Sequence, residues 1–462
     1  MNLPERHARH YLKLAESASG DWQTIDADLD QIRRGWNWVC TQPDIQLILE
    51  YIEALRAFQN NRGLWQEQIN WGEEVLKQVD GDDDHSRQSG ILQNIAWCYY
   101  ALGKFQIALG HLQQALALLD KKQNSSDYGP VLSALGVIYR ELGENSRSAE
   151  FLVRALEIRR KAGDKSGEAI ALGNLALFEN HRGNREEAIR LLQQASKIHE
   201  DQSNISLLAT TLNNIGALYE ITGSFDNAAI AYQDALAIHE SMGDMRMMAI
   251  TLNNQGKLLV QQGKLREASA SYEQALETNR ILGNPIEEAT TLSNLGHLFS
   301  TSGDVTKAQE YYRAAHQIFS SVKYQEGEAQ LLNNIGAMHN RARNYDDAIR
   351  ILKQGLDLAQ SLDNKALISD ILNNLGQAEA ARGRLEKAEE LYREALQISQ
   401  QISDPHGEMV TLLNLSSVYA QLEKWQSARE CCEEAQPIAR KLGNAKMEQL
   451  ATEILSILKL VE

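Results

Sequence analysis

The sequence repeats with a fixed period of 40 residues. One position of this period carries asparagine almost throughout the chain, and only the step at Ala134 lacks it. These ladder asparagines are Asn94, Asn174, Asn214, Asn254, Asn294, Asn334, Asn374 and Asn414. A fixed period of about 20–50 residues is typical of proteins built from stacked repeats, each of which contacts only its neighbours. The period therefore limits the fold before any local propensity is considered.

Each unit has the pattern of two helices. In residues 211–243, Leu212, Ile215 and Tyr219 fall on one helical face, and a second helical pattern begins at Ala228. Glycine recurs in the turn between the two patterns, where a chain leaving a helix often needs a left-handed residue. These turn glycines are Gly103, Gly143, Gly183, Gly223, Gly263, Gly303 and Gly383. The sequence predicts a helix, a tight turn and a second helix in every unit.

Small residues fill one column on each predicted helix. On the first helix they are Gly136, Gly216, Gly256, Gly296, Gly336 and Gly376. On the second helix they are Ala115, Ala155, Ala195, Ala235, Ala275, Ala315, Ala395 and Ala435. Helix backbones approach closely only where side chains are small, so these columns predict the contacts between helices.

In these columns the sequence resembles the tetratricopeptide repeat (TPR) family. The family pattern, L-x-x-[IL]-G-x-x-Y followed by A-x-x-x-[YF]-x-x-A, extends over nine consecutive units in about residues 85–444. The resemblance implies an all-α fold, a TPR superhelical solenoid of antiparallel helix pairs. The 40-residue unit is longer than the common TPR unit of ~34 residues. It is similar to the units of LGN/Pins adaptors, kinesin light chains and bacterial signalling proteins.

Three parts of the chain follow from this pattern. Residues 1–84 are less regular, and we expect an N-terminal helical capping region with one degenerate repeat. Residues 85–444 hold the nine 40-residue units, and 445–462 form a C-terminal capping helix, with a dimerisation helix as the alternative. The N-terminal part also resembles the helical arm of bacterial STAND-type (NB-ARC and AfsR-like) regulators. No G-x-x-x-x-G-K-[ST] phosphate loop occurs in the sequence.

Composition narrows the classes of partner. The formal net charge of −16 argues against nucleic acid, whose phosphates need a concentrated basic face. No apolar run approaches the ~20 residues of a membrane-spanning helix, which argues against membrane insertion, and we expect a cytoplasmic protein. The four cysteines form no C-x-x-C pair and are interpreted as free thiols.

Catalytic and cofactor motifs are missing from the sequence. It contains no G-x-S-x-G, no H-E-x-x-H and no glycine-rich phosphate loop after a strand. His7 and His10 share a predicted helix face, but no third ligand lies near them in sequence, so no metal site is expected. We therefore expect a protein that is not an enzyme and has no cofactor.

The ladder is the strongest candidate for a binding site. Its asparagine precedes the glycine column by two residues, about 200° around a helix, so it points away from the second helix. The TPR resemblance implies that this column holds the backbone of an extended peptide, because a carboxamide both donates and accepts hydrogen bonds. The asparagines that precede it in several units, Asn213, Asn253, Asn333 and Asn373, extend the polar strip. The alternative is that each amide bridges to the backbone of the next repeat and stabilises the stack.

Further residues on the same face define the expected ligand. One turn after the ladder lie Trp97, Lys257 and His297, and Arg341 follows four residues beyond the next such position. With the net charge, they predict a protein or peptide partner that is neutral to basic. We expect a protein-interaction module that binds a partner segment in its groove. The alternative is the sensor arm of a STAND-type signalling system that recognises a folded protein.

Overall fold

The structure, a computed structural model, describes residues 3–17, 22–42, 44–79, 85–120, 127–402 and 404–461. These residues form α-helices joined by short turns, and no strand occurs among them. The predicted all-α fold is confirmed. The less regular N-terminal part is helical as well, with four helices among its described residues.

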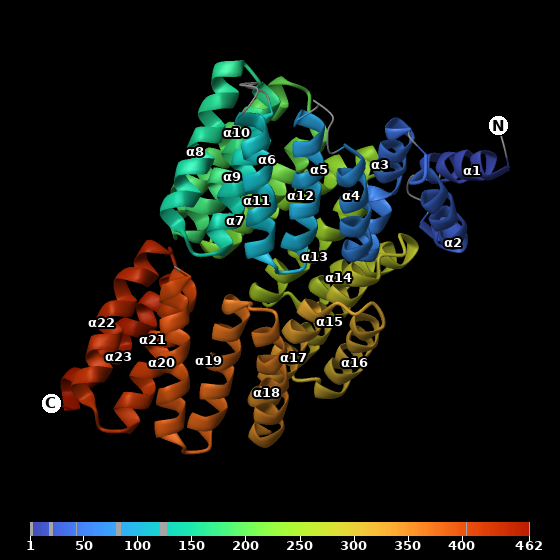
Figure 1. Cartoon of the computed structure of the whole chain (residues 1–462). Helices are drawn as coiled ribbons and strands as arrows, with labels where there is room; N and C mark the ends of the chain where they lie inside the picture. The colour runs from blue at the N-terminus through green and yellow to red at the C-terminus, as the bar shows by residue number, and fades with distance from the viewer. Residues whose placement is uncertain are drawn as a thin grey trace. The chain divides into compact units, whose positions relative to one another are not determined.

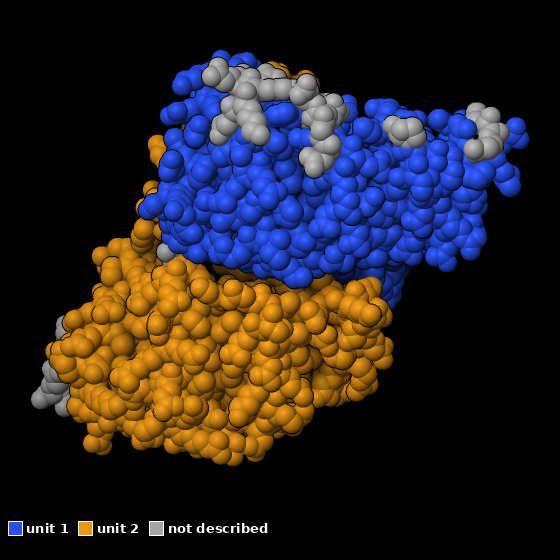
Figure 2. All heavy atoms as spheres, viewed as in Figure 1, with its two compact units in different colours: residues 1–164, 277–288 blue, residues 165–276, 289–462 orange. Residues whose placement is uncertain are grey.

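The chain divides into two compact units (Figure 2). Unit 1 comprises Met1–Asp164 and Glu277–Glu288, and unit 2 comprises Lys165–Leu276 and Ala289–Glu462. The helices up to residue 164 are α1 (Leu3–Ser17), α2 (Trp22–Val39), α3 (Ile45–Arg62), α4 (Trp65–Val79), α5 (His85–Ala101), α6 (Phe105–Asp120), α7 (Tyr128–Glu141) and α8 (Asn145–Ala162).

The remaining helices are labelled in chain order in Figure 1. They are α9 (Lys165–His181), α10 (Arg185–Asp201), α11 (Ile205–Ile221), α12 (Phe225–Met242), α13 (Met245–Gln261), α14 (Leu265–Ile281), α15 (Pro285–Ser302), α16 (Val305–Ser321), α17 (Gln325–Arg341), α18 (Tyr345–Ser361), α19 (Lys365–Ala381), α20 (Leu385–Gln401), α21 (Pro405–Gln421), α22 (Trp425–Lys441) and α23 (Ala445–Val461).

The two small-residue columns lie at helix contacts, as predicted. A Cβ added to Gly216, Gly256, Gly296 or Gly376 would lie 2.5–2.7 Å from the ring of the tyrosine 16 residues later, on the second helix of the same pair. The alanines of the second column are buried at the centre of the stack. The glycine column therefore allows a tyrosine ring to pack directly on the first-helix backbone.

Gly296→Ala is expected to lower the free energy of unfolding by about 1–2 kcal/mol. Overpacking a dense core costs about 1–3 kcal/mol, and the better helix propensity of alanine returns at most ~1 kcal/mol. Gly173→Ala on α9 is the matched control, because a Cβ there meets no atom within 4 Å. We expect it to raise stability by about 0.5–1 kcal/mol. Chemical denaturation followed by far-UV circular dichroism measures both, and equal effects would contradict this account of the column.

The turns also follow the prediction, with informative exceptions. The turn glycines adopt positive φ, for example 78° at Gly183. Arg343 replaces the glycine of its turn and still adopts φ 60°, and Lys323 in the preceding joint adopts φ 56°. Helices α17 and α18 around this turn keep 17 residues each, so no shortening marks the seventh unit. Because this unit has no glycine in its turn, we expect it to unfold before the other units of the array.

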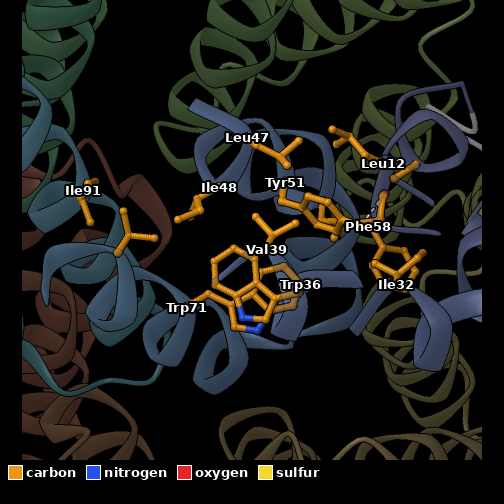
Figure 3. Close-up of a cluster of buried hydrophobic side chains, with 14 of the residues drawn as sticks. Leu12, Ile32, Trp36, Val39, Leu47, Ile48, Tyr51, Phe58, Trp71 and Ile91 are labelled. Atoms are coloured by element: carbon orange, nitrogen blue, oxygen red, sulfur yellow. Dashed lines mark hydrogen bonds between the residues drawn. The ribbon is translucent and has the colours of Figure 1, made fainter. Parts of the chain in front are cut away.

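Side chains from α1 to α5 form one buried cluster at the start of unit 1 (Figure 3). Trp36 on α2 stacks on Trp71 of α4, with ring centroids 4.1 Å apart. The Tyr51 hydroxyl donates to the Ala8 carbonyl at 2.6 Å and ties α3 to α1. Bulky core filling accounts for these two tryptophans. The predicted boundary at residue 84 lies outside the described residues, and α5 begins at His85.

The end of unit 2 is covered by α23. Ala451 and Leu458 are buried against α21 and α22, whereas Leu450 and Ile457 are exposed. This packing is what a capping helix requires. Dimerisation through the exposed side of α23 remains a prediction. No helix in the described part of the chain is long and apolar enough to cross a membrane.

Candidate functional site

The ladder asparagines from Asn174 to Asn414 lie on the first helices of unit 2. We call the surface around these residues the ladder face; it includes one residue from each of α9, α11, α13, α15, α17, α19 and α21. Each of them is partly exposed to solvent. Asn94 lies on α5 in unit 1 and does not belong to the ladder face.

Five ladder side chains donate hydrogen bonds to the preceding repeat. In each bond the Nδ2 group reaches a side-chain oxygen 41 residues earlier. The bonds are Asn254 to Asn213 (3.1 Å), Asn294 to Asn253 (3.3 Å), Asn334 to Ser293 (3.2 Å), Asn374 to Asn333 (2.7 Å) and Asn414 to Asn373 (3.4 Å). The ladder therefore links neighbouring first helices through side chains. This agrees with the alternative in which the amides bridge repeats, with side chains rather than backbone as the acceptors.

The asparagines that directly precede the ladder residues in several units are buried and take part in the same hydrogen-bond network. Asn213, Asn253, Asn333 and Asn373 are only 6–9% exposed. Asn253 also donates to the Thr291 hydroxyl at 2.9 Å, and Asn373 donates to the Thr411 hydroxyl at 2.8 Å. Each of these two buried amides thus makes two contacts with the following repeat, one to a threonine and one to a ladder asparagine. Their position fits a role in orienting the ladder side chains better than direct contact with a ligand.

The ladder amides keep hydrogen-bonding capacity after these bonds. Among the described residues, the Oδ1 atoms of Asn254, Asn294, Asn374 and Asn414 accept no hydrogen bond, and one N–H of each amide is also unused. A carboxamide fixed through one N–H presents its oxygen in a defined direction. The ladder face therefore offers a regular series of oriented acceptors and donors.

Lys257, His297 and Arg341 come together in the middle of the ladder face. Loss of solvent around the imidazole, together with the charges of Arg341 and Lys257, lowers the pKa of His297. The Arg341 guanidinium donates to the Ser300 hydroxyl at 2.9 Å. Lys257 lies 4.0 Å from the carboxylate of Glu220 and is largely exposed. The predicted residues thus form a local positive region within an acidic protein.

Two acidic residues on this face were not predicted from the sequence. Glu220 is buried and accepts hydrogen bonds from Tyr232 (3.0 Å) and Gln261 (2.7 Å), and burial raises its pKa. Asp370 lies one turn before Asn374, and the surrounding protein and Asp404 raise its pKa to about 6. The spacing of four residues from the ladder was the signal that could have identified Asp370. Its negative charge is lost as the pH falls through about 6.

Asn94 and Trp97 lie apart from this set, in unit 1. Both line a cavity of about 620 Å³ between α3, α4 and α5. The Trp97 side chain is 43% exposed and packs edge-to-face on Tyr100, with centroids 5.3 Å apart. The four cysteines are free thiols. In the described part of the chain, no three His, Cys, Asp or Glu side chains are grouped as metal ligands would be.

Sequence profiles of known families match most of the repeats. A profile described as tetratricopeptide repeat matches residues 127–201, 167–241, 207–281, 287–361 and 367–446. A second profile of the same description matches residues 96–121. Among curated proteins, none matches the chain at a significant level.

Several solved structures are similar to this chain. Yeast Tom70 aligns with a TM-score of 0.52 and 14% identity, over 98% of this chain and 96% of Tom70. Rap protein complexed with Competence and Sporulation Factor aligns with a TM-score of 0.50 and 16% identity, over 78% of this chain and 99% of Rap. A STAND protein with a tetratricopeptide repeat sensor from Pyrococcus horikoshii has a TM-score of 0.45 and 17% identity, over 74% of this chain and 55% of that protein. At these identities, the first two support the fold.

Proposed function

Because the chain belongs to the tetratricopeptide repeat family, we propose that it is a non-enzymatic scaffold that binds an extended segment of a partner protein along the ladder face. The observation that carries this proposal is that four partly exposed ladder amides are anchored through one N–H and keep an oxygen that accepts no hydrogen bond among the described residues; they are Asn254, Asn294, Asn374 and Asn414. An extended peptide has a free N–H and C=O at each residue, and carboxamides can bind both. We place the protein in the cytoplasm.

The buried asparagines act in this proposal as positioning residues. Asn253 and Asn373 hold the amides of Asn294 and Asn414 from the preceding repeat. A preorganised amide loses less side-chain entropy when a ligand binds, which favours affinity. The ladder therefore both braces the stack and recognises the peptide backbone, and the two functions use different atoms of the same side chain.

The bound segment is neutral to basic overall. The chain carries a formal charge of −16, which repels acidic ligands and attracts basic ones at long range. The positive region of Lys257 and Arg341 is a local exception. We expect the part of the ligand that lies over this region to present a carbonyl or a carboxylate, and the part near Asp370 to be neutral or basic.

Selection from a random peptide library tests the proposal directly. We expect the full chain to enrich linear peptides that bind wild-type protein and lose binding when ladder residues are changed. Enrichment of peptides that bind equally well to the ladder variant would contradict the ladder site. If no linear peptide is enriched and only folded proteins bind, the sensor-arm alternative is favoured.

Salt should weaken the binding of a basic peptide. Electrostatic attraction between the acidic protein and a basic ligand raises the association rate, and salt screens it with a Debye length of about 10 Å at 0.1 M. We expect the association rate to fall about tenfold from low salt to 0.5 M. The control is the same peptide with its Lys and Arg residues replaced by Gln, whose rate should barely change. Stopped-flow fluorescence measures both, and tighter binding of an acidic peptide at low salt would show that Lys257 and Arg341 outweigh the net charge.

A further inference from the structure

A second candidate site lies in unit 1. Helices α3, α4 and α5 line an open cavity of about 620 Å³, within the range of about 300–1,000 Å³ that is common for ligand pockets. The tetratricopeptide pattern does not require it, because α3 and α4 belong to the part of the chain without a regular repeat. All residues that line it belong to unit 1.

The wall of this cavity is mainly apolar and aromatic. Trp65 and Trp71 of α4, Trp97 of α5 and Ile95 line it. Trp71 is fixed by its stacking on Trp36 in the buried cluster, which makes this side of the wall rigid (Figure 3). Trp97 is 43% exposed, unlike the buried Trp71. A partly exposed tryptophan beside a rigid apolar wall is suited to contact a large apolar side chain.

Polar atoms in the wall lack partners of their own. Trp65 Nε1 and Arg56 Nε are buried donors for which no described residue supplies an acceptor. Both residues line the cavity. A buried donor without a partner costs about 1–3 kcal/mol, and a ligand oxygen within reach removes that cost. A backbone carbonyl of a peptide is an acceptor of the required kind.

The carboxylates of the wall add a charge preference. Glu53 pairs with Arg56 at 2.5 Å, so these two charges offset one another. Glu50 makes no ion pair among the described residues, and its Oε1 accepts only a hydrogen bond from Gln46 at 3.2 Å. The cavity therefore carries one uncompensated negative charge beside an apolar wall. A cation next to an apolar group complements both features.

From these contacts we infer that the cavity binds a large apolar side chain of a partner peptide, followed directly by a lysine or arginine that pairs with Glu50. The apolar side chain contacts Trp71 and Trp97. The inference does not depend on the ladder face, because every residue involved lies on α3, α4 or α5. Either site can fail without the other.

Fluorine NMR of the full chain labelled with 5-fluorotryptophan tests the inference. The probe is acetyl-Gly-Phe-Lys-Gly-amide, and signals are assigned through single Trp→Phe variants. We expect saturable shifts of the Trp65, Trp71 and Trp97 signals, and no shift of Trp38 or Trp425, which do not line the cavity. The same peptide with Ala in place of Phe should bind at least about tenfold more weakly, because it buries far less apolar surface.

Variants separate the apolar and the ionic contributions. Glu50→Gln should abolish the preference for the Phe-Lys peptide over a matched Phe-Glu peptide, a preference that we expect to be about three- to tenfold. Glu150→Gln is the matched control, since Glu150 is an exposed carboxylate on α8 outside the cavity. Trp97→Ala should weaken both peptides, whereas Ile107→Ala, which removes an exposed apolar residue on α6, should not.

Three results would overturn the inference. They are unchanged Trp65, Trp71 and Trp97 signals at millimolar probe, equal binding of the Phe and Ala peptides, and equal binding of the Lys and Glu peptides to wild-type protein. The ladder variants leave all of these measurements unchanged, so failure here does not affect the proposed function. The Phe-Lys probe is also titrated against the ladder variants. Loss of binding of a library-selected peptide in those variants therefore does not decide whether the cavity binds the probe.

Discussion

Replacing Asn253 and Asn373 with alanine is expected to destabilise unit 2 by about 2–4 kcal/mol. Each of these buried amides accepts a bond from the next ladder asparagine and donates to a threonine of the next repeat. Removing one partner of a buried hydrogen bond costs about 1–3 kcal/mol, and the better helix propensity of alanine returns ~0.5 kcal/mol per site. Urea denaturation monitored by far-UV circular dichroism measures the loss.

The neighbouring ladder pair provides the control. Asn254→Ala with Asn374→Ala deletes one partly exposed donor per site and leaves one acceptor, Oδ1 of Asn213 or Asn333, without that bond, while the buried bonds of Asn253 and Asn373 to the threonines remain. We expect this variant to lose no more than about 1 kcal/mol. Equal destabilisation of the two double variants would contradict this account, in which Asn253 and Asn373 stabilise the stack and Asn254 and Asn374 contribute little to stability. Because repeats contact only their neighbours, the transitions are analysed without assuming two states.

The contrast between these asparagines explains what the sequence could and could not predict. A helical period fixes the direction of a side chain around its own helix, so the glycine column was assigned correctly to the contact with the second helix. It does not fix the stagger between neighbouring helices. The bond from Asn294 to Asn253 depends on that stagger, which places residues 41 positions apart within 3.3 Å. The sequence therefore suggested a bridge to the backbone of the next repeat as an alternative, whereas the observed acceptors are side chains of the preceding repeat.

The cavity in unit 1 could not be predicted from the sequence, for a related reason. A regular repeat predicts its contacts because each unit resembles the next, and α3 and α4 lack that regularity. Large aromatic side chains such as Trp36 and Trp71 fill the core of this region. Trp65, in contrast, lines a cavity and keeps a buried Nε1 without a partner among the described residues. This environment depends on how α3, α4 and α5 pack together, and the sequence of these helices has no regular repeat that would predict it.

The combined change of Asn214, Asn254, Asn294 and Asn334 to alanine is expected to weaken binding of a selected peptide by 100-fold or more. Each amide–backbone contact contributes about 0.5–1.5 kcal/mol, so four contacts give about 2–6 kcal/mol, and 100-fold corresponds to about 2.7 kcal/mol. One deletion alone should weaken binding only about fivefold. Isothermal titration calorimetry of the four single variants and the quadruple variant measures this series.

The stability of the quadruple variant shows whether the ladder asparagines bind the peptide or only stabilise the stack of repeats. Three of its four sites lose a bond to the preceding repeat, and the helix propensity of alanine offsets most of that cost. We expect a net loss of about 1 kcal/mol, too small to unfold the protein. The matched control removes four exposed carboxamides from second helices of unit 2, through Gln194→Ala, Asn227→Ala, Gln317→Ala and Gln354→Ala. It should leave peptide binding unchanged. If the ladder variant instead melts far below wild type and its folded fraction binds normally, the amides only brace the stack, and the peptide site must lie away from the ladder face.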